Sequence, residues 1–289
     1  MSDPLLLTTT LVRTFDGQRA LSAASGFFFR RGDAVFLVTS RHVLLDEAAE
    51  HRPNRIELEV HGDTRTLSLV RVLSCWLYAE GRARWRQGRD AGGDIDVAVL
   101  ELDTADLPDT AAWRCFTPAH LQAELDAVQV GSALLIVGFP LGFHDTVHHL
   151  PVVRQATVAS AFGVRFQGQG QFLTDGRTHR GSSGGPVVMP DAQGDPQLPW
   201  KLLGVHASRF DMRTRDLGQD ESLGLNSAWY ADILLTLTAP VAPVAGVPVA
   251  AVAAGAAAAQ PAPSPAPAAG HHTAPPEGAS AARTLPPTR

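Results

Sequence analysis

The most concentrated chemical signal in this sequence lies near residue 180, where the chain reads T-H-R-G-S-S-G-G-P-V-V. Two adjacent serines, Ser182 and Ser183, stand between glycines in this stretch. Glycine permits sharp turns in which consecutive backbone N–H groups point toward one spot. We therefore take Ser183 as a candidate nucleophile and the amides of Gly181 and Ser183 as a candidate oxyanion hole. A flexible surface turn is the alternative interpretation.

A serine hydroxyl is a weak nucleophile at neutral pH and needs a neighbouring base, which a third group must orient. The candidate base is His42, at the end of the apolar run F-L-V-T-S-R-H-V-L, although a structural histidine would look the same. The candidate orienting group is Asp96, in D-I-D-V-A-V-L. Because Asp96 directly precedes an apolar run, we expect its carboxylate to be buried and paired with an imidazole N–H. Asp94 competes for this role, and a turn at the end of a strand is the other interpretation of Asp96.

The elements that must position these residues are mostly strands. Residues 1–238 contain short β-branched or aromatic segments separated by Gly, Asp or Pro, and R-R-G-D between two apolar runs predicts a hairpin. Helices are predicted at 117–128, where Thr117 and Pro118 give a start signal, and at 226–237. Many strands with one helix near the midpoint and one at the end suggest an all-β fold of two β-barrels joined by a linker.

The chain divides by composition into three parts. Residues 1–116 are expected to form an N-terminal barrel that carries His42 and Asp96. Residues 117–238 are expected to form a linker helix, a C-terminal barrel that carries Ser183, and a terminal helix. Residues 239–289 are mostly Ala, Pro, Val and Gly, and such a segment cannot offset its ordering entropy, so we expect a disordered tail. The prolines within 239–259 disfavour a membrane span there.

Composition and charge exclude some classes of protein. The 289 residues, 45% of them hydrophobic, suffice for one large domain or two small ones. A formal charge of −5 does not provide the excess of positive charge that binding to nucleic acid requires. Two cysteines, Cys75 and Cys115, do not make a disulfide scaffold and suit a reducing compartment. The start M-S-D-P-L-L-L-T-T-T does not resemble a secretory signal, so a cytoplasmic location is expected.

The three motifs together resemble a known family. S-R-H-V, D-V-A-V-L and G-S-S-G-G-P resemble the histidine, aspartate and serine signatures of trypsin-like (chymotrypsin-fold) serine peptidases, in the same chain order. The resemblance spans residues of about 20 to 235. It is closest to the bacterial Deg (high-temperature-requirement, HtrA) variety without a signal peptide, which also has T-D upstream of the nucleophile, as at Thr174-Asp175. The family implies two six-stranded antiparallel β-barrels with the site in the cleft between them.

One departure from the family pattern is informative. Digestive members carry an acid just before the nucleophile, which pairs with a new N-terminus released by cleavage. That position is Ser182 here, so activation by such cleavage is not expected. G-S-S-G-G also fits the nucleophile elbow of α/β-hydrolases, in which a helix follows the serine and the acid and histidine come later in the chain. Here a strand-like P-V-V follows, and His206 is the one later histidine in the core, so this interpretation fails on both points.

Substrate preference is open between two alternatives. In the resembled family, the strand after the nucleophile walls the substrate pocket, and here that strand is L-L-G-V-H-A-S-R-F, with His206, Ala207 and Ser208. Thr178 would lie on the opposite wall. This His and Thr pair is similar to that of glutamyl endopeptidases and picornavirus-type proteases, which prefer Glu or Gln, and Arg177 would add positive charge. Otherwise His206 packs against the barrel and the pocket takes small apolar residues.

Other reactive side chains are not assigned a role. His144, Asp145, His148 and His149 form a cluster whose i, i+4 histidines would suit a metal on a helix, but the neighbouring residues favour a loop, and we predict no metal or cofactor. Cys75 and Cys115 are expected to be buried small residues.

The sequence therefore predicts a serine endopeptidase that acts on proteins or peptides through His42, Asp96 and Ser183. The rival is a peptide-binding or docking module that keeps the fold without turnover. The Ala/Pro-rich tail could tether a partner in either case.

Overall fold

A computed structural model describes residues 3–105, 111–213 and 220–240, with the backbone alone at 209–213 and 220–222. Strands dominate these residues, which confirms the predicted all-β class. The predicted disordered tail, from residue 241 onward, lies outside the described residues. Within the part described, no helix is long and apolar enough to cross a bilayer.

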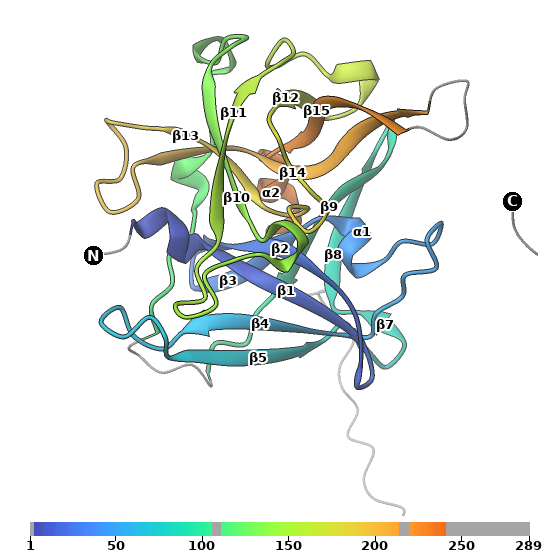
Figure 1. The fold of residues 1–289 in the computed structure, drawn as a ribbon, viewed down its shortest axis with the longest axis vertical. Coiled ribbons are helices and arrows are strands. Elements are labelled where there is room, and N and C mark those ends of the chain that lie inside the picture. The colour runs from blue at the N-terminus through green and yellow to red at the C-terminus, as the bar shows by residue number, and fades with distance from the viewer. Residues whose placement is uncertain (1–2, 106–110, 214–219, 241–289) are drawn as a thin grey trace, which may run out of the picture. The chain divides into compact units, whose positions relative to one another are not determined.

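The N-terminal half of the chain forms a seven-stranded sheet in which every neighbouring pair is antiparallel. In Figure 1, β1 to β5 lie in the lower half, whereas β8 and β9 rise toward the strands of the barrel. Its order is β5-β4-β1-β2-β3-β9-β8. The strands are β1 (Thr9–Asp16), β2 (Arg19–Arg31), β3 (Ala34–Thr39), β4 (Arg55–His61), β5 (Val70–Trp76), β8 (Trp85–Asp90) and β9 (Gly93–Glu101), and a separate small hairpin joins β6 (Tyr78–Ala79) to β7 (Arg82–Ala83).

The C-terminal half forms a closed six-stranded barrel, in the order β10-β11-β12-β15-β14-β13. It occupies the upper half of Figure 1. The barrel closes where β13 pairs with β10, as at Ile136 and Val187. Its strands are β10 (Ala133–Gly138), β11 (Val152–Val158), β12 (Gln171–Asp175), β13 (Pro186–Pro190), β14 (Trp200–Arg213) and β15 (Asp220–Tyr230).

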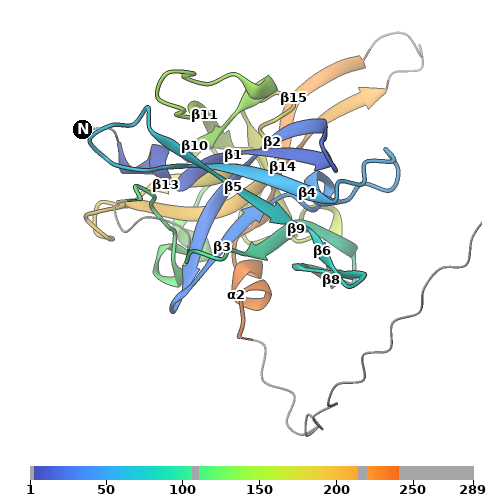
Figure 2. The same ribbon diagram turned by 90° about the horizontal axis from the view of Figure 1, so that it is seen from below.

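Helical elements in the described residues are short. The α-helices are α1 (Arg41–Leu44), which follows β3, and α2 (Ile233–Leu237), which packs beside β8 in the lower part of Figure 2. The 3₁₀ turns are η1 (Pro4–Thr8), η2 (Pro118–His120), η3 (Leu125–Ala127), η4 (Pro140–Gly142) and η5 (Phe166–Gly168). α1 is a single turn, so it serves to place its residues at the end of β3.

The C-terminal half forms the predicted six-stranded antiparallel barrel, and the N-terminal half forms a second antiparallel sheet, in agreement with the predicted two-part all-β fold. The N-terminal sheet has seven strands, and its end strands β5 and β8 do not pair with each other. At one edge of this sheet, Val72 and Trp76 of β5 are 54% and 55% exposed, so this strand is not covered by β8. The predicted R-R-G-D hairpin is confirmed, because Arg31 pairs with Ala34 across a turn in which Gly32 has a φ of +59°.

Of the two predicted helices, the one at 117–128 is wrong and the one at 226–237 is too long. Thr117 and Pro118 do begin a helical turn, but it ends after three residues, and no linker helix forms at 117–128. Leu121 is extended instead and bridges Leu202 of the barrel, a tertiary contact that overrides local helix propensity. The terminal helix covers 233–237 only, because 226–230 belong to β15, in which 226–229 pair with β12.

The core explains how the two halves hold together. Phe27, Phe28 and Phe29 of β2 are all at most 2% exposed. Since side chains alternate along a strand, Phe28 packs inside the sheet, whereas Phe27 and Phe29 belong to a cluster that also contains barrel residues such as Val205. β2 is thus covered on both faces, and this fixes the sheet against the barrel.

Candidate active site

His42 and Asp96 form a directly bonded pair. His42 lies in α1, just after β3, and Asp96 lies in β9, which pairs with β3. The Nδ1 atom of His42 lies 2.8 Å from Oδ2 of Asp96, and the His42 backbone N–H donates to Oδ1 at 2.9 Å. Two contacts to one carboxylate fix both the helix turn and the imidazole ring, and they leave Nε2 of His42 for other chemistry. The Asp96 side chain is 25% exposed, so the expectation of a buried carboxylate is wrong.

The electrostatics of this pair favour the protonated imidazole. Burial opposes the charge on His42, but the hydrogen bond and the negative charge of Asp96 outweigh it, so the pKa of His42 is raised above its usual 6.5. Asp94, the competing acid, instead lies near the guanidinium groups of Arg41 and Arg89.

Ser183 lies in the loop between β12 and β13, within the same pocket as His42. Its hydroxyl donates to the carbonyl of Ala207 at 2.8 Å. Among the described residues, no hydrogen bond joins Ser183 to His42. The three predicted catalytic residues are therefore brought to one place, but the hydroxyl is turned toward β14 and not toward the imidazole.

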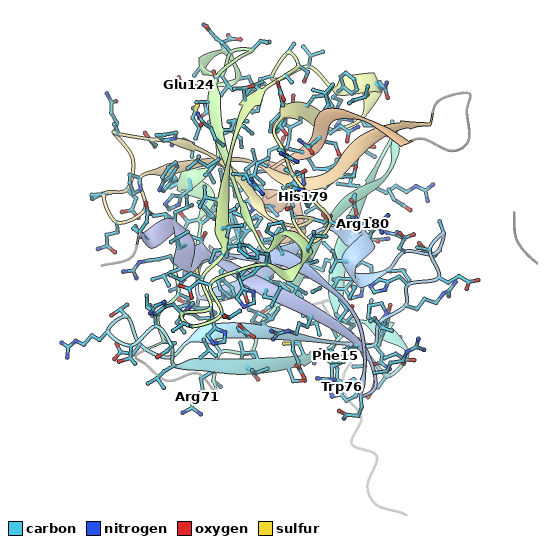
Figure 3. All side chains as sticks on the ribbon, in the orientation of Figure 1. Phe15, Arg71, Trp76, Glu124, His179 and Arg180 are labelled. Atoms are coloured by element: carbon cyan, nitrogen blue, oxygen red, sulfur yellow. The ribbon has the colours of Figure 1, made fainter. Side chains whose placement is uncertain are left out.

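The amides proposed for the oxyanion hole are free in the described part of the chain. Neither the N–H of Gly181 nor that of Ser183 donates a hydrogen bond to a described residue. The Leu141 amide donates to the carbonyl oxygen of Arg180 at 2.6 Å. Because a trans peptide places its C=O and N–H on opposite sides, this bond turns the Gly181 N–H away from Leu141. Figure 3 labels Arg180 in the region where sheet and barrel meet.

The glycines around Ser183 are required by close backbone approach. Gly184 has a φ of +84°, and a Cβ there would lie 2.2 Å from the carbonyl oxygen of Ser25. Gly181 has a φ of +91°, and its Cβ would lie 2.6 Å from the carbonyl oxygen of Phe139. Any side chain at these two positions would clash with backbone carbonyl groups and displace the loop. This packing contradicts the alternative of a flexible surface turn.

Sequence reasoning missed Ser25, a fully buried residue of β2 that ties the sheet to this loop. Its amide donates to the carbonyl of Ser183 at 3.0 Å, and its hydroxyl donates to the carbonyl of Gly181 at 2.7 Å. The same hydroxyl accepts from the Phe139 amide at 2.9 Å. The signal in the sequence that could have identified Ser25 is a small polar residue directly before the apolar run G-F-F-F.

The pocket beside Ser183 has a volume of about 200 Å³. It is lined by His42, Thr178, His179, Arg180, Ser183, His206, Ala207 and Ser208. Four of the five predicted pocket residues are among these. The fifth, Arg177, is exposed and does not line the pocket, so the structure gives no support to its placement there.

The hydrogen-bonding capacity of this pocket is well defined. The Asn226 amide group donates to the carbonyls of Thr174 and Gly176, so its oxygen faces Thr178 and accepts from the Thr178 hydroxyl. Thr178 has thereby used its one proton and can only accept from a ligand. His206 is 2% exposed, and burial, helped by the charge of His42, lowers its pKa to about 4. Its ring is thus neutral near pH 7, and Nδ1 has no partner among the described residues.

The two cysteines are free and half-buried. Burial raises the pKa of both thiols, which disfavours the reactive thiolate.

Comparison with known proteins gives one family match and a structural match. The model of a family described as the trypsin-like peptidase domain matches residues 24–195, a range that includes His42, Asp96 and Ser183. Among solved structures, the chain is similar to a serine endoprotease from Yersinia pestis, with 15% sequence identity and a TM-score of 0.46. That match covers 80% of this chain and 61% of the Yersinia chain. A search of the curated proteins finds no match.

Proposed function

Because the chain belongs to the trypsin-like peptidase family, we propose that it is a serine endopeptidase with His42, Asp96 and Ser183 as its catalytic residues. The observation that carries this proposal is the bonded His42–Asp96 pair in one pocket with Ser183, beside two unpaired backbone amides. A nucleophile, an oriented base and free donors are what acyl transfer requires.

In the proposed reaction, Nε2 of His42 takes the hydroxyl proton of Ser183 as Oγ attacks the carbonyl carbon of the peptide. The amides of Gly181 and Ser183 bind the resulting oxyanion, and Asp96 holds the imidazole and stabilises its positive form. His42 then gives the proton to the leaving amine, and the first product departs. Water repeats the same steps on the acyl-enzyme and restores Ser183.

The bond from Ser183 to Ala207 suggests how substrate enters this scheme. The Ala207 carbonyl belongs to β14, and a substrate backbone N–H laid beside that strand would compete for it. Once displaced, the Ser183 hydroxyl can turn about its Cα–Cβ bond toward His42. Substrate binding and alignment of the nucleophile would therefore occur together.

For the residue before the scissile bond, we propose glutamine in preference to glutamate or small apolar residues. A glutamine amide can donate to the Thr178 hydroxyl oxygen and accept from the neutral ring of His206. A carboxylate cannot donate to Thr178, and the neutral imidazole offers it no full positive charge. A small apolar residue would give the Thr178 oxygen no donor and the His206 ring no acceptor.

The rival function is a peptide-binding module that holds extended chains along β14 without cleaving them. The observation that favours it is the Ser183 hydroxyl, which is bonded to Ala207 and not to His42. Both functions use the same pocket, so a test of the nucleophile separates them.

Labelling with a fluorophosphonate probe tests the enzyme directly. We expect stoichiometric labelling of the protein, and its loss in Ser183→Ala. The matched control is Ser182→Ala, because Ser182 is the adjacent serine and is 3% exposed. Folded protein that resists the probe, or labelling that persists in Ser183→Ala, would favour the binding module.

Location and partners are proposed on separate grounds. Two free thiols support a reducing compartment such as the cytoplasm. The Ala/Pro-rich tail remains a candidate tether for a partner. Fractionation of cells that produce the full chain, with and without residues 241–289, would test both points.

A further inference from the structure

Three potential metal ligands meet outside the candidate active site. Glu59 comes from β4, whereas His144 and His149 come from the loop between η4 and β11. One ligand atom from each residue can be chosen so that all three lie within 4.8 Å of one another. The proposed peptidase mechanism uses none of these residues.

The ring of His144 is oriented as a metal ligand requires. Its Nδ1 lies 2.7 Å from the carbonyl oxygen of Gly142. A carbonyl can only accept, so Nδ1 carries the proton and Nε2 presents a lone pair. A backbone carbonyl on the far nitrogen is the usual partner of histidines that bind metals.

Glu59 supplies a carboxylate from inside the sheet. Its side chain is only 8% exposed, and Arg13 pairs with the Oε1 atom. The other oxygen, Oε2, lies 2.8 Å from Nδ1 of His149. The acid is therefore ionised and directed at the histidine loop. Its Oε2 accepts from the Nδ1–H of His149, so a metal ion bound between these two atoms replaces that proton.

The backbone of the loop is strained at the residue that completes the cluster. His149 has a φ of +55°, in the left-handed region that side chains rarely adopt. Asp145 and Leu150 form an isolated bridge that closes the loop and keeps His144 and His149 at its base. A conformation of this kind is often retained where a side chain must be directed to a particular place.

We propose that Glu59, His144 and His149 bind a divalent transition-metal ion, of which zinc is the best match. Two imidazoles and one carboxylate, with a fourth position for water, are a ligand set that zinc accepts. Zinc holds such atoms about 2.0–2.2 Å away, hence roughly 3.4 Å from one another in a tetrahedron. From its 4.8 Å limit the cluster must contract by at most about 1.4 Å, a movement within reach of two partly exposed side chains on a loop.

This set differs from the one that the sequence suggested. The i, i+4 pair His144 and His148 would need a helix, and the structure has a loop there. His148 is half-exposed and its Nδ1 contacts Asp145 at 2.8 Å, away from the cluster. The carboxylate comes from a strand some 85 residues earlier, which spacing along the loop could not reveal.

Titration of the metal-free full chain with Zn²⁺, against a chromophoric chelator, tests the proposal without use of peptidase activity. His271→Ala/His272→Ala serves as the background, because that adjacent pair could bind zinc by itself. We expect one zinc per chain, and Co²⁺ should give the intense visible bands of a four-coordinate site. His144→Ala and His149→Ala should each weaken binding at least tenfold, and Glu59→Gln by about 10- to 100-fold.

Two control variants make the result specific. His148→Ala removes a neighbouring loop histidine, and His42→Ala removes the imidazole of the candidate active site, so both should bind zinc within twofold of the background protein. Circular dichroism verifies that each variant is folded. Absence of a one-to-one complex, retention of affinity in both His144→Ala and His149→Ala, or an equal loss in His148→Ala would overturn the proposal.

Discussion

The amide of Leu141 donates to the carbonyl oxygen of Arg180 at 2.6 Å, and this one bond orients the peptide that carries the Gly181 N–H. Leu141 adopts a φ of +55° and is 72% exposed, so its side chain contributes little to the core. What matters at this position is a backbone donor in an unusual conformation. The candidate oxyanion hole is thus held from outside its own loop.

Replacing Leu141 by proline should therefore disable catalysis while the fold persists. Proline has no N–H and cannot adopt a positive φ, so the Arg180 carbonyl loses its partner. Loss of one oxyanion donor costs about 10²- to 10³-fold in kcat. Leu141→Gly is the matched control, because it keeps the N–H and tolerates the conformation. Equal kcat values for the two variants on a peptide substrate would contradict this role.

Ser25→Ala should reduce both stability and turnover. The change leaves the carbonyl of Gly181 and the amide of Phe139 without a buried partner, at a cost of about 1–3 kcal/mol. Because Ser25 acts on the nucleophile loop, kcat should fall more than KM rises. Denaturant unfolding and steady-state kinetics measure the two effects. Ser22→Ala, an exposed site on the same strand whose hydroxyl contacts Thr14 and not the Ser183 loop, should leave kcat and KM within about twofold. A matching loss of kcat there would refute the assignment.

The pH dependence of kcat/KM should rise through the pKa of His42. The base must be neutral, and Asp96 holds that pKa above 6.5, so activity is lost as pH falls through a value higher than 6.5. Asp96→Asn should lower this midpoint and reduce kcat by about 10⁴-fold. The sign is opposite for stability, because the protonated pair stabilises the fold at low pH and this contribution disappears as pH rises through the same pKa. A rate that stays constant down to pH 4 would exclude His42 as the base.

Substrate preference should depend on the Thr178 hydroxyl, whose proton is donated to Asn226 and whose oxygen can therefore only accept a hydrogen bond from substrate. We expect peptides with Gln before the scissile bond to be cleaved roughly tenfold or more faster than matched Glu peptides, measured as kcat/KM. Thr178→Val removes the acceptor and should reduce this ratio toward one. Thr178→Ser keeps the hydroxyl and serves as the control. A best substrate with Ala or Val at that position would instead support the small apolar alternative.

Much of the candidate site was predictable because its residues lie in short sequence patterns that indicate their chemistry. The turn around Ser183, the strand end at His42 and the acid before the V-A-V-L run each stand in a continuous stretch. The strand class was equally accessible, since β-branched and aromatic segments alternate with turn residues. The helix at 117–128 failed for a different reason: Leu121 gains a bridge to Leu202 that no local propensity could reveal.

The residues that were missed act at long range. Ser25 reaches Gly181 across 156 positions, and Glu59 reaches His149 across 90. Closure of one barrel and the open edges of the sheet also depend on which strands meet, as does the choice of Ala207 as partner of the Ser183 hydroxyl.

By itself, the sequence determined which side chains could serve as base, acid and nucleophile, and that strands would carry them, because residue type and short-range spacing set intrinsic reactivity and local conformation. Only the tertiary structure decided how the Ser183 hydroxyl is turned, which backbone groups hold the peptide before Gly181, and which acid meets the histidine loop. Those choices depend on hydrogen bonds between segments that are distant along the chain, and such contacts exist only after the sheet and the barrel have packed together.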